Sequence, residues 1–181
     1  MKRSVLTLAV LFLFLVTATY IQAKEAQYVG VKKCKTCHMS KKRGNQYGKW
    51  KASLHAKAFE TLASEEAKAV AKKAGVEGDP QKSPKCLKCH VTGFDAPASA
   101  KAATLTQEEG VSCEACHGPG SLYKSMKVMK ALSAGTQDPK AVALEIPSEA
   151  TCKKCHNEES PTYKPFKFDE RVKEIAHPVP K

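Results

Sequence analysis

The chain has 181 residues, and the 158 that follow a predicted leader contain only 23 Val, Ile, Leu and Phe, about 15% of that segment. In the same segment 28 Lys and Arg stand against 18 Asp and Glu, so the net charge is +10. Low hydrophobicity with high net charge is typical of chains that cannot offset their ordering entropy by burying side chains. This composition excludes a multi-pass membrane protein and a large multidomain enzyme, and it indicates either disorder or a core that side chains do not supply alone.

Residues 1–23 have the pattern of a secretory signal peptide. Lys2 and Arg3 form a basic start, a run of twelve mostly apolar residues follows, and a stretch of small residues ends the segment. We expect cleavage after Ala23, with Ala18 as the alternative site. An uncleaved anchor helix is disfavoured because spanning hydrocarbon needs about 20 apolar residues. The leader predicts a periplasmic, exported protein without a transmembrane segment after cleavage.

All eight cysteines fall in four Cys-x-x-Cys-His motifs, each of which ends in a histidine. The motifs are Cys34, Cys37 and His38; Cys86, Cys89 and His90; Cys113, Cys116 and His117; and Cys152, Cys155 and His156. One such motif would arise by chance at a frequency of about 0.01 per chain, so four are not accidental. Two thiols three residues apart lie on one side of a helical turn and can add to the two vinyl groups of one haem, while the histidine reaches the iron. The motifs predict four covalently bound haem c groups, numbered here haem 1 to haem 4 in chain order.

Other uses of paired cysteines explain this pattern less well. Structural zinc needs two cysteine pairs per ion and gives no reason for a histidine after every pair. A thioredoxin-like redox motif needs a βαβ setting that the sequence lacks. Four disulfides would be usual for eight cysteines in an exported chain, but they would leave the regular spacing unexplained. Covalent haem attachment is therefore the preferred interpretation.

The number of histidines limits how the four irons are ligated. The chain has six histidines, and four of them are proximal ligands, so only His55 and His177 remain. Within one chain at most two haems can then have two histidine ligands. This argues against a multihaem nanowire in which every haem is bis-histidine. The other two irons use a methionine, another side chain, a neighbouring subunit or no distal ligand.

The segments between the motifs predict short helices and long loops. The expected helices are 49–74, 122–134 and 169–176, with a short helix at each attachment motif, and the expected loops are 77–85 and 95–107. Apolar residues at helical spacing favour the helices, and Pro, Gly, Ser and Ala favour the loops. Residues 24–181 are therefore predicted to form a single, mainly α domain around its haems.

Four side chains in these segments are candidate distal ligands. His55 lies in the first expected helix, where the alternative is a surface histidine, and His177 ends the last one just before Pro178. Met126 and Met129 lie in the helix expected after the third motif, where packing against a haem face is the alternative role.

Other side chains are weaker candidates. Lysine and Tyr123 are less suited as ligands. Met39 directly follows a proximal histidine, so its backbone lies on the wrong side of its own haem.

Four stretches of the chain resemble the tetrahaem cytochromes of the cytochrome c-554 family. They are 50–62, 86–94, 110–120 and 166–177. Together with four haem motifs in this order, the resemblance covers nearly the whole chain after the leader. It implies a small multihaem cytochrome c fold and the role of an electron carrier.

The resemblance also implies one ligand arrangement for each haem. The implied distal ligands are His177 for the haem of His117 and His55 for the haem of His156, with an open face on the haem of His90 and a ligand for the haem of His38 from after the third motif. The chain departs from the family at the last point, because residues 121–127 contain no histidine. We therefore predict Met126 as the distal ligand of haem 1, with a second five-coordinate haem as the alternative.

Two functions are compatible with this arrangement. The first is an electron relay between redox enzymes or carriers, alone or as a subunit of a larger conduit. The second is a reductase that acts on a small molecule such as nitric oxide at open haem 2. Near that haem, residues 86–94 contain no second histidine or arginine to donate protons, and only Lys85 and Lys88 are close in sequence. We favour the carrier because most of the irons are predicted to be closed.

The charge bears on the partners of such a carrier. Eight haem propionates and four ferric charges would bring the +10 of the chain to about +6 in the oxidised protein. This favours redox proteins with acidic docking surfaces. Export makes nucleic acid an improbable partner.

Overall fold

A computed structural model describes residues 25–177, and the predicted signal peptide, 1–23, lies outside the described residues. Within 25–177 the chain forms nine short α-helices joined by 3-10 turns and loops, and no β-strand. An isolated parallel bridge joins Tyr28 to Lys101. The predicted mainly α fold is confirmed.

Each haem motif lies on a helix or starts on one, as predicted. The helices are α2 (Val31–His38), α3 (Gln46–Ala52), α4 (Ala58–Thr61), α5 (Glu65–Lys73), α6 (Pro84–His90), α7 (Cys113–His117), α8 (Met126–Ser133), α9 (Glu149–Lys153) and α10 (Phe168–Ile175). The first three motifs end α2, α6 and α7, whereas Cys155 and His156 lie in the turn after α9. None of the helices between residues 25 and 177 has the length and apolar character needed to cross a membrane.

The segment 49–74 is not one helix but is divided by two serines. Ser53 is extended, with φ −83° and ψ 162°, so α3 ends before it and a 3-10 turn, Leu54–Lys57, follows. Ser64 is also extended, and its hydroxyl caps α5 by accepting a hydrogen bond from the Ala67 amide at 3.1 Å. As a result, His55 lies in a 3-10 turn rather than in the middle of a long helix.

Other element boundaries differ from the prediction by a few residues. Helix α8 begins at Met126 because the Ser125 hydroxyl accepts a hydrogen bond from the Val128 amide at 3.3 Å. The loop predicted at 77–85 already contains the start of α6, where Pro84 occupies the first turn. Proline fits there because the first amides of a helix have no intrahelical acceptor.

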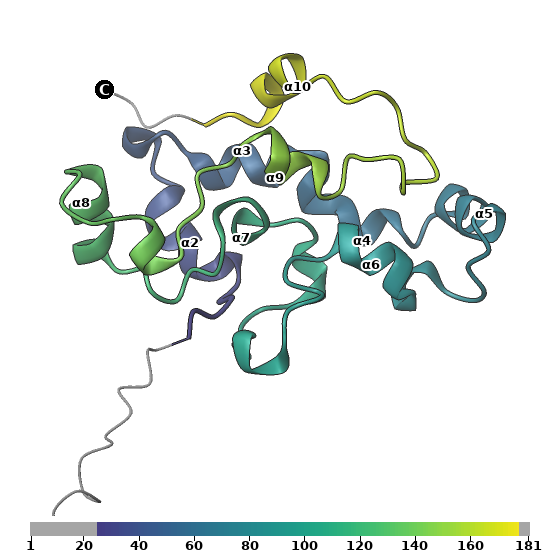
Figure 1. Cartoon of the computed structure of the whole chain (residues 1–181), viewed down its shortest axis with the longest axis horizontal. Helices are drawn as coiled ribbons and strands as arrows, with labels where there is room; N and C mark the ends of the chain where they lie inside the picture. The colour runs from purple at the N-terminus through teal and green to yellow at the C-terminus, as the bar shows by residue number, and fades with distance from the viewer. Residues whose placement is uncertain (1–24, 178–181) are drawn as a thin grey trace, which may run out of the picture.

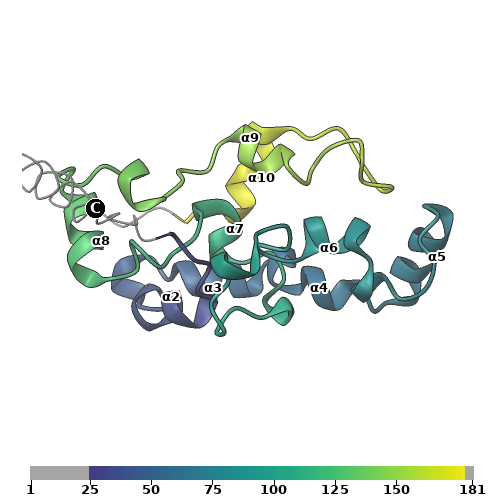
Figure 2. The same ribbon diagram turned by 60° about the horizontal axis from the view of Figure 1, so that its bottom comes forward.

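The helices form an elongated molecule with distinct ends (Figures 1 and 2). Helices α2, α3 and α8 lie toward one end, α4, α5 and α6 toward the other, and α7 between them. In Figure 2, α9 and α10 form a second layer over the first. An ion pair between Lys88, on α6, and Glu159, on the loop after α9, joins this layer to the end formed by α4–α6.

Side chains alone give the described residues a small core. One cluster contains buried Val31, Trp50 and Ala56, with Tyr47 and Cys113 packed against it. The second contains buried Leu62, Leu87 and Val91, with Phe59, Cys86 and Phe94 against it. Because each cluster includes a haem-attachment cysteine, apolar packing already converges on the attachment points.

Candidate haem sites

The four attachment motifs lie next to one another in a fixed order. Their thiols meet in the pairs Cys34 with Cys113, Cys89 with Cys155, and Cys116 with Cys152. In the first two pairs the neighbouring thiol is the main cause of a pKa shift, and in the third pair burial is the main cause and the neighbouring thiol a smaller one. The motifs therefore follow one another in space as first, third, fourth and second.

These contacts also perturb the free thiols. The hydrogen bond with Cys113, followed by burial, raises the pKa of the Cys34 thiol. A hydrogen bond with Cys155 lowers the pKa of Cys89 to about 7. A cysteine sulfur bonded to haem is a thioether and does not titrate, so these shifts belong to the chain before haem attachment.

Four of the six histidines face each other in two pairs. The ring centroids of His55 and His156 lie 6.0 Å apart with planes at 80°, and those of His117 and His177 lie 5.9 Å apart with planes at 65°. A metal bonds imidazole nitrogen at about 2.0 Å, and the ring centroid lies about 1.2 Å further back, so two rings across one metal have centroids about 6.4 Å apart. Both pairs therefore fit a haem iron between the rings.

The turn that carries His55 packs against residues 110 and 111, just before the third motif. The His55 carbonyl accepts a hydrogen bond from the Val111 amide at 3.0 Å, and the Trp50 indole N–H donates to the Val111 carbonyl at 2.8 Å. Gly110 has φ +64°, and a Cβ there would lie 2.8 Å from the His55 carbonyl oxygen. Glycine thus permits the close approach that fixes His55.

His117 is held at two points by residue 145. Its Nδ1 lies 3.2 Å from the Glu145 carbonyl oxygen, and its own carbonyl accepts from the Glu145 amide at 2.9 Å. Gly118, at φ +74°, allows the contact because a Cβ there would lie 2.6 Å from the Ala143 carbonyl oxygen. The bond at Nδ1 leaves Nε2 for a metal.

Backbone carbonyls orient two further histidines in the same way. The His90 Nδ1 lies 2.7 Å from the Ala58 carbonyl oxygen, and the His177 Nδ1 lies 2.8 Å from the Ile175 carbonyl oxygen. In each ring Nε2 is again the nitrogen left for iron.

His38 differs because its Nδ1 partner is a side chain. The Nδ1 atom lies 3.3 Å from Gln46 Oε1, while Gln46 Nε2 donates to the Arg43 carbonyl. That second bond sets the amide orientation, so Oε1 accepts from the His38 ring. This role could not be predicted, since nothing in the spacing of Gln46 from the motif indicates a contact.

Burial favours the neutral, metal-binding form of three of the four paired rings. It lowers the pKa of His55, His117 and His156, with smaller contributions from neighbouring charges. A neutral imidazole has the lone pair that a ligand needs. His156 also stacks on Phe166, with centroids 4.8 Å apart and planes at 18°.

Within the described residues neither His38 nor His90 faces a second histidine ring, because His55 faces His156 and His177 faces His117. Met126 lies in the first turn of α8 and is 44% exposed, and its sulfur lies 4.0 Å from Arg43 Nη1. The structure thus places Met126 beside the segment that follows His38, and its role as a ligand stays a prediction.

Tyr123 supports the turn after His117. It is buried, and its hydroxyl donates to the Gly118 carbonyl at 2.8 Å. This contact occupies the hydroxyl group and adds to the support of the turn after His117.

A buried carboxylate joins the first motif to the third. Glu114, inside the third motif, is 1% exposed. It accepts hydrogen bonds from the amides of Val29 at 2.9 and 3.0 Å, Gly30 at 2.8 Å and Gly120 at 2.6 Å. Sequence reasoning missed this residue, although it is the one acidic residue within the four motifs.

Glu109 adds a second bond at the same place. It accepts from the Val31 amide, the first residue of α2, at 2.8 Å. Burial raises the pKa of Glu109, and this bond opposes the shift. The two carboxylates together fix the start of α2 against α7.

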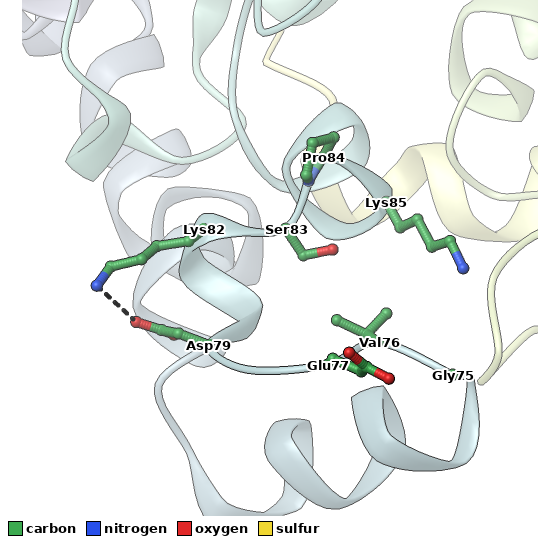
Figure 3. A pocket seen from close by; sticks show the side chains of 8 residues that line it. All are labelled: Gly75, Val76, Glu77, Asp79, Lys82, Ser83, Pro84 and Lys85. Carbon is green, nitrogen blue, oxygen red and sulfur yellow. Dashed lines mark ion pairs between the residues drawn. The ribbon is translucent and has the colours of Figure 1, made fainter.

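A hollow of about 450 Å³ between the end of α5 and the start of α6 is separate from these sites (Figure 3). Its lining comes from 75–85 and includes Asp79 and Lys82, whose charged atoms lie 4.0 Å apart. No histidine or cysteine lines it.

Comparison with known proteins agrees with this geometry. The family model described as "Cytochrome c554 and c-prime" matches residues 33–118. A solved structure of reduced cytochrome c554 from Nitrosomonas europaea superimposes with a TM-score of 0.58 at 30% identity, covering 83% of this chain and 84% of that one. Cytochrome c-554 of the same organism is 32% identical, over 90% of this chain and 79% of the relative. The chain therefore belongs to the cytochrome c-554 family, as a c-type cytochrome electron carrier with four covalently bound haem c groups.

Proposed function

We propose that the protein is a periplasmic relay that passes electrons between redox proteins through four haems in the spatial order 1, 3, 4, 2. The observation that supports it is that His55 faces His156 and His177 faces His117. Each pair would close the iron site of one of the two middle haems. An iron closed on both sides exchanges electrons without binding a substrate. The leader predicted at 1–23 supports the periplasmic location, where c-type haem is retained by its covalent bonds.

The ligand arrangement proposed for the relay has three parts. His117 and His177 ligate haem 3, and His156 and His55 ligate haem 4, which their ring separations support. His38 and Met126 ligate haem 1, supported by the place of Met126 beside the segment after His38. His90 is the sole ligand of haem 2.

Electron paramagnetic resonance of the ferric protein, with haem quantitation, tests this arrangement. His55→Ala and His177→Ala should each convert one low-spin haem to high spin while four haems stay attached. Met126→Ala should do the same for haem 1, and Met129→Ala, on the same helix, should leave the spectrum unchanged. A Met126→Ala spectrum identical to wild type would overturn the methionine ligand and make haem 1 a second open haem.

A second candidate function, reduction of nitric oxide at haem 2, rests on the absence of a second histidine for His90. Turnover there also needs proton donors. Of the two lysines near the motif, Lys88 forms an ion pair with Glu159, and this contact raises the pKa of Lys88. A lysine held protonated gives up its proton less readily, so binding without turnover is the expected result. Sustained consumption of nitric oxide by the reduced protein would favour the enzyme instead.

A further inference from the structure

The charges of this chain are unevenly distributed along the sequence. Residues 26–59 contain nine Lys and Arg and no Asp or Glu, and residues 115–137 contain three Lys and no Asp or Glu. The first segment includes α2, with the first haem motif, and the second includes α8. All 18 carboxylates of the chain therefore lie outside these two segments.

The two segments meet at one end of the molecule. Helices α2 and α8 lie side by side there in both views (Figures 1 and 2), and Arg43 Nη1 lies 4.0 Å from Met126 Sδ. We call this region the cationic end and define it by the exposed cations of 32–43, six in number, together with Lys124, Lys127 and Lys130.

Within residues 25–177 the cations of this end have no acidic partners. Seven ion pairs occur within residues 25–177, and none uses a cation of the cationic end. In contrast, Lys68 and Lys82 near α5 and Lys88 on α6 are each paired with a carboxylate. One haem brings two propionates, so even if both lay here most of the nine charges would stay uncompensated.

An exposed apolar side chain lies within this charged region. Met39 is 52% exposed and directly follows His38, the proximal ligand proposed for haem 1. A small apolar centre with a charged rim is suited to brief contact between proteins, because the rim charges speed encounter and the contact stays weak.

We propose that the cationic end is the docking surface at which an acidic redox protein exchanges electrons with haem 1. This rests on the relay function proposed above and assigns its entry or exit point. In each encounter one electron passes between the two proteins: the donor is oxidised by one electron and haem 1 is reduced by one, with no bond or proton exchanged. A protein is favoured over an anionic membrane because the surface surrounds the first haem motif, where a redox partner must approach closely.

Two charge-reversal variants with the same change in net charge test the proposal. Lys41→Glu/Lys42→Glu alters the cationic end, and Lys72→Glu/Lys73→Glu alters two exposed lysines at the end of α5. The probe is reduced flavodoxin, a small acidic one-electron donor, mixed with the ferric holoprotein in a stopped-flow instrument. Circular dichroism and haem content should first match wild type for both.

At low ionic strength, the Lys41→Glu/Lys42→Glu change should slow bimolecular reduction about tenfold, and the control pair should stay within about twofold of wild type. The tenfold difference should shrink as salt shortens the screening length. Equal slowing in both variants would mean that only net charge matters and would overturn the docking surface. Because wild type would still be reduced, that result would leave the relay function intact, whereas no reduction of wild type would contradict the relay itself.

Vesicles that contain phosphatidylserine provide the second arm of the test. The proposal expects co-sedimentation with the vesicles to be the same for the two variants. Binding by wild type that only Lys41→Glu/Lys42→Glu abolishes, together with unchanged flavodoxin rates, would identify a membrane surface and overturn the proposal.

Discussion

The two ends of the molecule hold the same kind of haem motif by different means. At the cationic end, the start of α2 is fixed by hydrogen bonds from its amides to Glu114 and Glu109. At the other end, α6 is held by apolar packing of Leu87 against Leu62 and Val91, and by the surface ion pair of Lys88. A buried carboxylate fixes geometry tightly but depends on every bond being made, whereas apolar packing tolerates small changes. We therefore expect the cationic end to be held more precisely than the end formed by α4–α6.

The largest effect is expected from removing the haems, which should affect both ends alike. Changing all eight cysteines to serine should leave a largely unfolded chain, because each apolar cluster has only three buried residues. Such clusters are too small to offset the ordering entropy of about 150 residues. Far-ultraviolet circular dichroism of this variant should show little helix. Native helix content would mean that the protein folds without its cofactors and that the clusters are sufficient.

A change at Glu114 should destabilise one end of the molecule and not the other. Glu114→Ala leaves the amides of Val29, Gly30 and Gly120 without their acceptor in a buried place, at a cost of about 3 kcal/mol or more. Hydrogen exchange should become faster in α2 and α7, while α6 keeps its protection.

The matched control for that experiment is Glu77→Ala, which removes an exposed carboxylate near α5. It should change the free energy of unfolding by less than about 0.5 kcal/mol. If Glu114→Ala loosened α6 as much as α2, the ends would not be held independently.

The parts of the fold that follow local chemical rules could be predicted from the sequence. The four motifs are recognised by the spacing of their cysteines and histidines. The mainly α fold was predicted from apolar residues at helical spacing between the motifs. Helix α10 was predicted to within a residue at each end, and its acidic first turn and basic last turn are local signals that favour a helix there. The continuous helix at 49–74 was wrong because apolar periodicity continues across Ser53 and Ser64, and only the capping bonds reveal the breaks.

The arrangement between segments could not be predicted in the same way. A count of histidines limited the number of bis-histidine haems, but the partners of His55 and His177 came only from family resemblance. Glu114 contacts Val29, and Gln46 contacts His38. No helical or strand periodicity in the sequence indicates either contact. Such contacts depend on tertiary packing. From sequence alone, a charged or amide side chain near a motif is expected to be exposed to solvent.

The smallest expected effect concerns the tuning of haem 1 against haem 2. Gln46→Leu removes the acceptor at His38 Nδ1, which should raise the reduction potential of haem 1 by up to about 40 mV, the equivalent of one hydrogen bond of about 1 kcal/mol. Gln46→Glu should shift it the opposite way, because an anionic acceptor makes the imidazole a stronger donor to ferric iron. Haem 2 should not respond, since His90 is oriented by the Ala58 backbone carbonyl. Spectroelectrochemical titration resolves the four steps, and equal shifts in all of them would show that residue 46 acts through general charge rather than through His38.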